Sequence, residues 1–264
     1  MTYTNCVFPN GVCNNQYGKT VFDNCKFTNN TAGLSNLWNY GGETKVEECT
    51  FTGTRGIKMY NEGTLQNPPS IEIKNTNFTG MTEKAAIVVS KAANVTLNTV
   101  GATDCTMGLL QKDIEGSTDE QKVTIEANGT GISGDFNITA QKDAEAAKNE
   151  FNISAGEFTS EVKQDYCKDA FVVKAGADGK YTVARSEYVA KVGGTGYTTL
   201  EAALAELTAD NHTLTLIDSS KWPAATPVYW KAGDQSGYAA TLKAAMEAAN
   251  AKNAGSITII CKPN

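Results

Sequence analysis

The sequence predicts a mainly β protein in which a right-handed parallel β-helix, a solenoid, is followed by a hairpin and two small β-α-β modules. Two observations predict this class. A short phrase of alternating apolar and polar residues recurs along residues 21–160, and residues 188–264 contain a β-α-β pattern twice. The phrase returns roughly every 22 to 30 residues, a period typical of repeat architectures rather than of a β-sandwich.

The repeated phrase has the form apolar-x-apolar-x-Asn/Cys-x-x-Phe-Thr-Gly. Each copy is a short strand with a period of two residues, rich in β-branched side chains and closed by Asn, Thr or Gly. The copies lie at residues 21–30, 46–53, 71–80, 95–105, 123–136 and 151–160.

A second strand lies between successive copies, most clearly at residues 34–42, 56–63 and 85–94. Two or three strands per copy, joined by Asn and Gly turns, describe one coil of a parallel β-helix. A single coil cannot bury its own apolar side, so coils must stack to form a core. We therefore expect Phe27, Phe51 and Phe78 to form an inward stack, with Cys25 and Cys49 one above the other as small buried apolar residues.

The copies "VEECTFTG" and "IEIKNTNFTG" resemble the coils of parallel β-helix, or pectate-lyase-like, repeat regions in large cell-surface proteins of gut Gram-positive bacteria. The resemblance covers residues 21–160. It implies an extracellular or cell-wall location, as a fragment of a larger exported protein. It also implies a host glycan or host glycoprotein as partner, including mucosal immunoglobulin.

After the β-helix, which we place at residues 1–165, residues 166–187 are expected to form an exit hairpin. Two alternating runs, 171–174 and 180–184, flank an Ala-Asp-Gly turn of the kind that joins antiparallel strands. The same ending resembles the coil-to-hairpin exit of the surface proteins.

The last part of the chain, residues 188–264, changes to alternating strand and helix, with modules at 188–218 and 227–264. The segments "TLEAAL" and "TLKAAM" indicate a duplication. The first helix is expected to begin at Thr198 or Thr199 and to bury an apolar stripe. These modules are similar to units that precede further coils in the surface proteins.

The charge pattern disfavours two kinds of partner. The formal net charge is −6, and Lys and Arg are scattered rather than clustered. We therefore expect no nucleic-acid partner. No apolar run approaches the roughly 20 residues of a membrane helix, so we expect no membrane insertion. We expect a monomer.

The seven cysteines and the single histidine give no pattern of ligands. Their spacing fits neither a disulfide framework nor a zinc site. We expect mostly free thiols, no metal and no cofactor.

Catalytic residues are not identified. The segment "RGIK" at 55–58 is only loosely similar to an Arg-Ile-Lys motif of β-helix hydrolases, because a glycine intervenes and no histidine is near in sequence. Glu47 and Glu48 should point to opposite faces of a strand, so no inward pair of carboxylates is specified. A non-enzymatic chain is favoured. The alternatives are a polysaccharide lyase or glycoside hydrolase on the same fold, and an inert surface spacer.

A binding surface is the functional site that the sequence favours. The candidate ligand-binding residues are Trp38, Tyr60, Asn36, Lys58 and Tyr40. They are expected on the solvent side of adjacent coils, where aromatic rings on a rigid face suit sugar or protein recognition. The alternative is that a loop or the N-terminal segment covers them.

This placement depends on an assumed alignment of coils, in which Leu37 and Met59 point inward in line with Val89. Trp38 and Tyr60 would then point outward as a continuous aromatic step, because stacked coils lie about 4.8 Å apart.

A second aromatic cluster comprises Trp222, Tyr229 and Trp230, in and after the segment between the two modules. Packing between the modules is the favoured interpretation, and a ligand site is the alternative.

Overall fold

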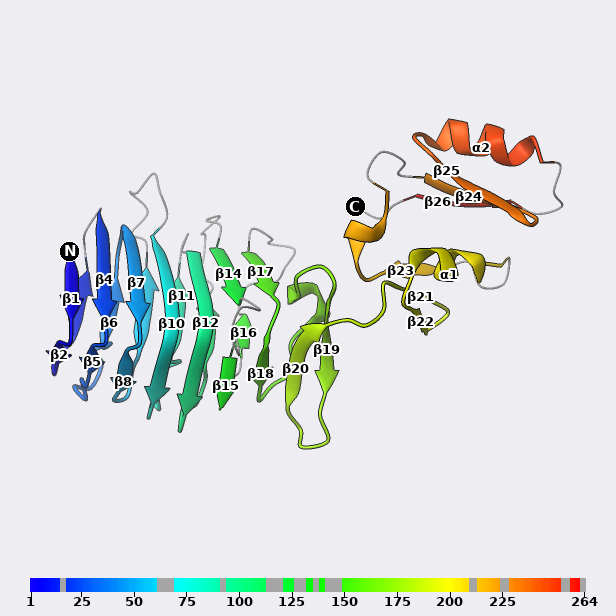
Figure 1. The fold of residues 1–264 in the computed structure, drawn as a ribbon. Helices are drawn as coiled ribbons and strands as arrows, with labels where there is room; N and C mark the ends of the chain where they lie inside the picture. Colours follow the sequence, from blue (N-terminus) through cyan, green and yellow to red (C-terminus); the bar gives the residue numbers. More distant parts are fainter. Residues whose placement is uncertain are drawn as a thin grey trace. The chain divides into compact units, whose positions relative to one another are not determined.

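The computed structural model describes residues 1–14, 18–60, 69–90, 94–112, 121–125, 132–134, 138–140, 149–208, 213–223, 228–252 and 257–261. Its strands stack side by side from β1 to β17 (Figure 1). Over residues 19–110 they form a parallel β-solenoid of about three turns, which confirms the predicted fold class. Part of the predicted copy at 123–136 lies outside the described residues.

Each coil contributes to three rows of parallel strands. Row 1 contains β1 (Thr2–Thr4), β4 (Lys19–Asp23), β7 (Glu43–Glu47), the first halves of β10 (Ser70–Thr79) and β12 (Asn94–Thr103), β14 (Gln121–Ile125) and β17 (Asn149–Ile153). Row 2 contains β2 (Val7–Phe8), β5 (Lys26–Phe27), β8 (Thr50–Thr52), the second halves of β10 and β12, and β15 (Ile132–Gly134). Row 3 contains β3 (Val12–Asn14), β6 (Leu37–Asn39), β9 (Ile57–Tyr60), β11 (Ile87–Ser90), β13 (Leu109–Lys112) and β16 (Ile138–Ala140).

The corner between rows 1 and 2 falls inside the repeated phrase. Asn24, Glu48, Asn75 and Thr99 stand there with φ values of 48°, 54°, 48° and 56°. Asn reaches this left-handed region more readily than most residues, which explains its recurrence in the phrase. The phrase is therefore a strand, a one-residue corner and a second strand.

The predicted aromatic stack is confirmed. Phe27, Phe51 and Phe78 are fully buried, with ring centroids 4.3 Å and 4.8 Å apart and nearly parallel planes. The stack continues to Phe8, 4.9 Å from Phe27. Offset stacking of this kind adds to the gain from burial, so the rings anchor the interior at row 2.

The predicted cysteine pair is also confirmed. Cys25 and Cys49 are buried in adjacent coils, and the backbone N–H of Cys25 donates to Sγ of Cys49 at 3.4 Å. Burial raises the pKa of Cys49 to about 11. Cys6, Cys25, Cys49, Cys105, Cys167 and Cys261 are free thiols, and Cys13 lies outside the described side chains.

The outer face of row 1 carries ion pairs between coils. Lys19 pairs with Glu43 at 2.8 Å, Lys45 with Glu72 at 2.9 Å and Lys74 with Glu47 at 2.9 Å. The side chains are well exposed, so each pair contributes little to stability. Glu47 lies on this face, and Glu48 is exposed at the corner that follows, so the two carboxylates form no inward pair.

The exit hairpin follows a short 3-10 helix, η2 (Gln164–Tyr166). It consists of β19 (Phe171–Ala175) and β20 (Tyr181–Arg185), and β20 also pairs antiparallel with β18 (Gly156–Phe158). The loop closes with a hydrogen bond from Gly176 N to Lys180 O, and Gly179 has a φ of 81°, in the region that favours glycine.

Each C-terminal module has one strand more than predicted, so its order is ββαβ. The first contains β21 (Ala190–Val192), β22 (Thr195–Tyr197), α1 (Leu200–Ala205) and β23 (Leu214–Leu216). After the 3-10 helix η3 (Ser219–Lys221), the second contains β24 (Val228–Ala232), β25 (Gln235–Ala239), α2 (Leu242–Asn250) and β26 (Ile257–Cys261). Both sheets are antiparallel. The extra strand, β22 in the first module and β25 in the second, follows a turn that contains glycine.

The first helix begins as predicted, and the second begins in the same way. The hydroxyl of Thr199 accepts a hydrogen bond from Ala202 N at 3.2 Å, and that of Thr241 accepts one from Ala244 N at 3.1 Å. These N-caps satisfy donors that a helix end leaves free. No helix in the described part of the chain is long and apolar enough to span a membrane.

The chain divides into two compact units. One contains Met1–Lys168 and Val172–Ala184, and the other contains Asp169–Phe171 and Arg185–Asn264. The domain boundaries at residues 165 and 187 stay predictions.

Candidate functional site

The outer face of row 3 holds most of the predicted ligand-binding residues. Leu37 and Asn39 of β6 point inward and are buried, so Trp38 between them points outward and is half-buried. In the next coil, Ile57 and Met59 of β9 point inward, and Lys58 and Tyr60 point outward.

The assumed alignment of coils was right for Met59, which pairs with Val89, and wrong by two residues for Leu37. Leu37 pairs with Ile57, which in turn pairs with Ile87. Trp38 is therefore beside Lys58 rather than Tyr60. A shift of two residues keeps every side chain on the same face, which is why the apolar pattern could not reveal it.

The structure brings the aromatic residues together around Lys58. Its Nζ lies 4.7 Å from the ring centroid of Trp38 and 5.1 Å from that of Tyr60. The Tyr40 ring lies 5.5 Å from Trp38 and 5.9 Å from Tyr60, edge-on to both. We call Trp38, Tyr40, Lys58 and Tyr60 the aromatic cluster. Ammonium contacts with ring faces of this kind are attractive and hold the side chains in place.

A cavity of about 170 Å³ adjoins the aromatic cluster. It is lined by Ser35, Trp38, Arg55, Gly56, Ile57, Lys58, Lys84, Ala85, Val88 and Leu110. Typical ligand pockets measure about 300–1,000 Å³, so this one has room for a single ring or side chain.

Trp38 also carries an unsatisfied hydrogen-bond donor. Its indole Nε1 is buried and has no acceptor among the described residues. A buried donor without a partner costs about 1–3 kcal/mol.

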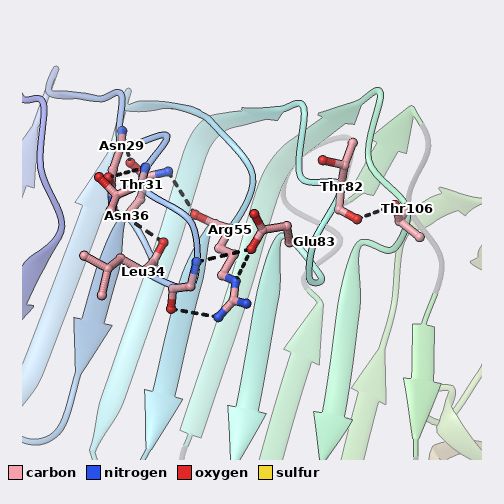
Figure 2. A network of polar contacts seen from close by, with 9 residues as sticks. Asn29, Thr31, Leu34, Asn36, Arg55, Thr82, Glu83 and Thr106 are labelled. Carbon is pink, nitrogen blue, oxygen red and sulfur yellow. Dashed lines mark hydrogen bonds and ion pairs between the residues drawn. The ribbon is translucent and has the colours of Figure 1, made fainter.

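Asn36, expected on the outer face, is instead buried at the corner before β6 (Figure 2). Its Nδ2 donates to Arg55 O at 2.9 Å and to Thr52 O at 3.1 Å, and its Oδ1 accepts from Asn29 N at 2.8 Å. The residue before a strand need not continue the alternation of that strand. Asn36 ties two coils together and is not exposed to a ligand.

Arg55, from the loosely motif-like segment 55–58, is held by its neighbours (Figure 2). Its Nε pairs with Oε2 of Glu83 at 2.7 Å, and its guanidinium donates to Gly33 O at 2.7 Å. Gly33 N donates to the same Glu83 oxygen at 3.4 Å. We call Gly33, Arg55 and Glu83 the corner bridge. It joins three successive coils.

The corner bridge predicts acid-dependent stability. The hydrogen bond from Arg55 holds the pKa of Glu83 below its usual value of 4.5. The stabilisation is therefore complete above the unfolded pKa and is lost as pH falls through the lower, folded pKa. We expect Glu83→Gln to lower the melting temperature at about pH 6 and to lower it much less at about pH 3.

Thermal unfolding followed by circular dichroism across this range checks the expectation. Glu187→Gln removes one charge outside the solenoid unit and serves as the matched control. A constant difference between Glu83→Gln and the unmodified chain at every pH would contradict the assignment.

The second aromatic cluster is buried. Trp222 and Tyr229 pack with the core of the first module, whereas Trp230 packs with the helix of the second. The Trp222 ring also lies 5.9 Å from Tyr238, edge-on. These contacts support packing between the modules.

Comparison with known proteins finds no matching family model, no matching curated protein and no matching solved structure. Within the described residues, no group of three or more His, Cys, Asp and Glu side chains is placed to hold a metal ion.

Proposed function

We propose that this chain is a non-enzymatic binding module whose recognition face is the aromatic cluster and the adjoining cavity. Its partner would be a host glycan or host glycoprotein, with mucosal immunoglobulin among the candidates. The cell-surface setting and the host partner rest on the resemblance of the repeated coils alone.

The observation that carries the proposal is the environment of Trp38. The ring is half-buried on the outer face of row 3, lines the cavity and contacts Lys58. A sugar ring offers an apolar face that can stack on an indole ring. An apolar or aromatic protein side chain offers the same contact, so both partner classes fit.

The expected result is that Trp38→Ala weakens binding by about 30-fold or more, the effect of losing about 2 kcal/mol at a central aromatic residue. Tyr60→Ala should weaken it less, because its ring lies outside the residues that line the cavity. The measurement is a screen of the purified chain against a glycan array and a panel of mucosal host proteins, followed by titration of each hit.

Lys45→Ala is the matched control, since Lys45 lies on the outer face of row 1 and pairs with Glu72 away from the aromatic cluster. It should leave the affinity unchanged. If binding to a hit were unchanged by Trp38→Ala, the binding site would lie away from the aromatic cluster. If neither the glycan array nor the host-protein panel showed binding, the alternative of an inert surface spacer would be favoured.

A further inference from the structure

The second unit is built in layers, and α1 packs against both of its sheets. Leu200, Ala203 and Leu204 of α1 share one buried cluster with Ala190 of β21 and Tyr229 of β24. Lys231, also on β24, donates from Nζ to Ala205 O at 2.7 Å and to Leu207 O at 3.1 Å, at the end of α1. The helix of the first module is therefore covered by the sheet of the second.

Strand β24 contributes to two different cores. Val228, Trp230 and Ala232 pack against α2, where they meet Ala245 and Ala249. Tyr229, on the opposite face of the strand, packs toward α1 together with Tyr238 of β25, their ring centroids 5.4 Å apart. The layers of the second unit follow in the order first sheet, α1, second sheet, α2. Tyr229 and Tyr238 lie where α1 meets the second sheet.

In the described part of the chain, the large apolar side chains of the last layer, α2, are exposed. The duplicated segments align Leu200 with Leu242 and Leu204 with Met246, counted from the capping threonines. Leu200 and Leu204 are 3% and 2% exposed, whereas Leu242 and Met246 are each 49% exposed. The two helices carry the same apolar side chains, but those of α1 are buried in the cluster with Tyr229, whereas Leu242 and Met246 of α2 are exposed.

We propose that Leu242 and Met246 of α2 form a docking face for the sheet of a further ββαβ module of the same type. The contact between the two modules of this chain is the template, and it defines the occupant as a three-stranded antiparallel sheet that presents a tyrosine pair. A second copy of this chain does not meet that description, because its own Tyr229 is 4% exposed and already packed on its own α1.

The test extends the full chain after Asn264 with a copy of residues 219–264, which supplies a third module together with the segment that precedes its first strand. The added copy carries Met246→Leu, so that only the original Met246 is scored. We expect oxidation of that methionine by dilute hydrogen peroxide to slow by at least about fivefold relative to the unextended chain, because the thioether becomes covered. Peptide mass spectrometry measures the rate.

A second extended chain, whose added copy also carries Tyr229→Ser and Tyr238→Ser, is the matched control. It should oxidise at the rate of the unextended chain, since the tyrosine pair that covers the face is gone. Equal protection in both extended chains, or protection in neither, would overturn the proposal.

Substitution in the natural chain provides an independent measurement. Leu242→Glu with Met246→Lys should leave the melting temperature of the second unit nearly unchanged, as expected for an exposed face. Leu200→Glu with Leu204→Lys should abolish its folding, because it places charges in a buried cluster. Equal losses from the two pairs would show that the α2 face belongs to the core of its own module, and would overturn the proposal.

Discussion

Phe51→Ala is expected to lower the free energy of unfolding of the solenoid by about 3–5 kcal/mol, the range for truncating a buried phenylalanine. Phe51 lies in the middle of the aromatic stack, between Phe27 and Phe78, and its side chain is fully buried. Removing the ring deletes two stacking contacts and leaves a cavity, which the coils on either side cannot close without losing their strand pairing.

Urea unfolding followed by far-ultraviolet circular dichroism measures this loss. Phe8→Ala is the matched control, because Phe8 ends the same stack and is only half-buried. It should cost clearly less than Phe51→Ala. If the two substitutions lowered the free energy of unfolding equally, the ring of Phe51 in the middle of the stack would contribute no more to stability than the half-buried ring of Phe8 at its end.

Asn36→Ala is expected to cost about 2–3 kcal/mol, because it leaves buried backbone groups without partners. The backbone N–H of Asn29 loses its acceptor, the Oδ1 of Asn36 at 2.8 Å. Thr52 O loses the donor at 3.1 Å, whereas Arg55 O keeps its hydrogen bond from the backbone N–H of Asn36. The cost therefore comes mainly from two groups rather than three.

The same unfolding measurement checks this expectation. Asn30→Ala, an exposed change of the same kind in the same corner, should alter the free energy of unfolding by less than about 0.5 kcal/mol. If Asn36→Ala were equally mild, the corner would not depend on the side chain of Asn36.

The aromatic stack and the cysteine pair could be predicted because they repeat at the same place in each phrase. Phe27, Phe51 and Phe78 follow their corner residues at a constant distance, so their stacking requires only that the coils be in register at that corner. The alternating apolar pattern then fixes which side of each strand faces the core.

The lateral neighbours on row 3 could not be predicted in the same way. The chain between row 2 and row 3 differs in length from coil to coil, and an error of two residues leaves the apolar pattern intact. Trp38 was therefore paired with Tyr60 instead of Lys58. The inward turn of Asn36 was missed because it depends on the corner before β6, where strand alternation does not apply.

The corner bridge also connects the coils of Gly33 and Glu83, which are not adjacent. In most solenoids each repeat touches only its immediate neighbours, and stability is a sum of nearest-neighbour terms. A link that skips one coil adds a coupling between next-nearest neighbours. The coil of Gly33 then cannot detach without breaking a contact made two coils away. Detaching that coil should therefore cost slightly more free energy than its contacts with adjacent coils alone would give.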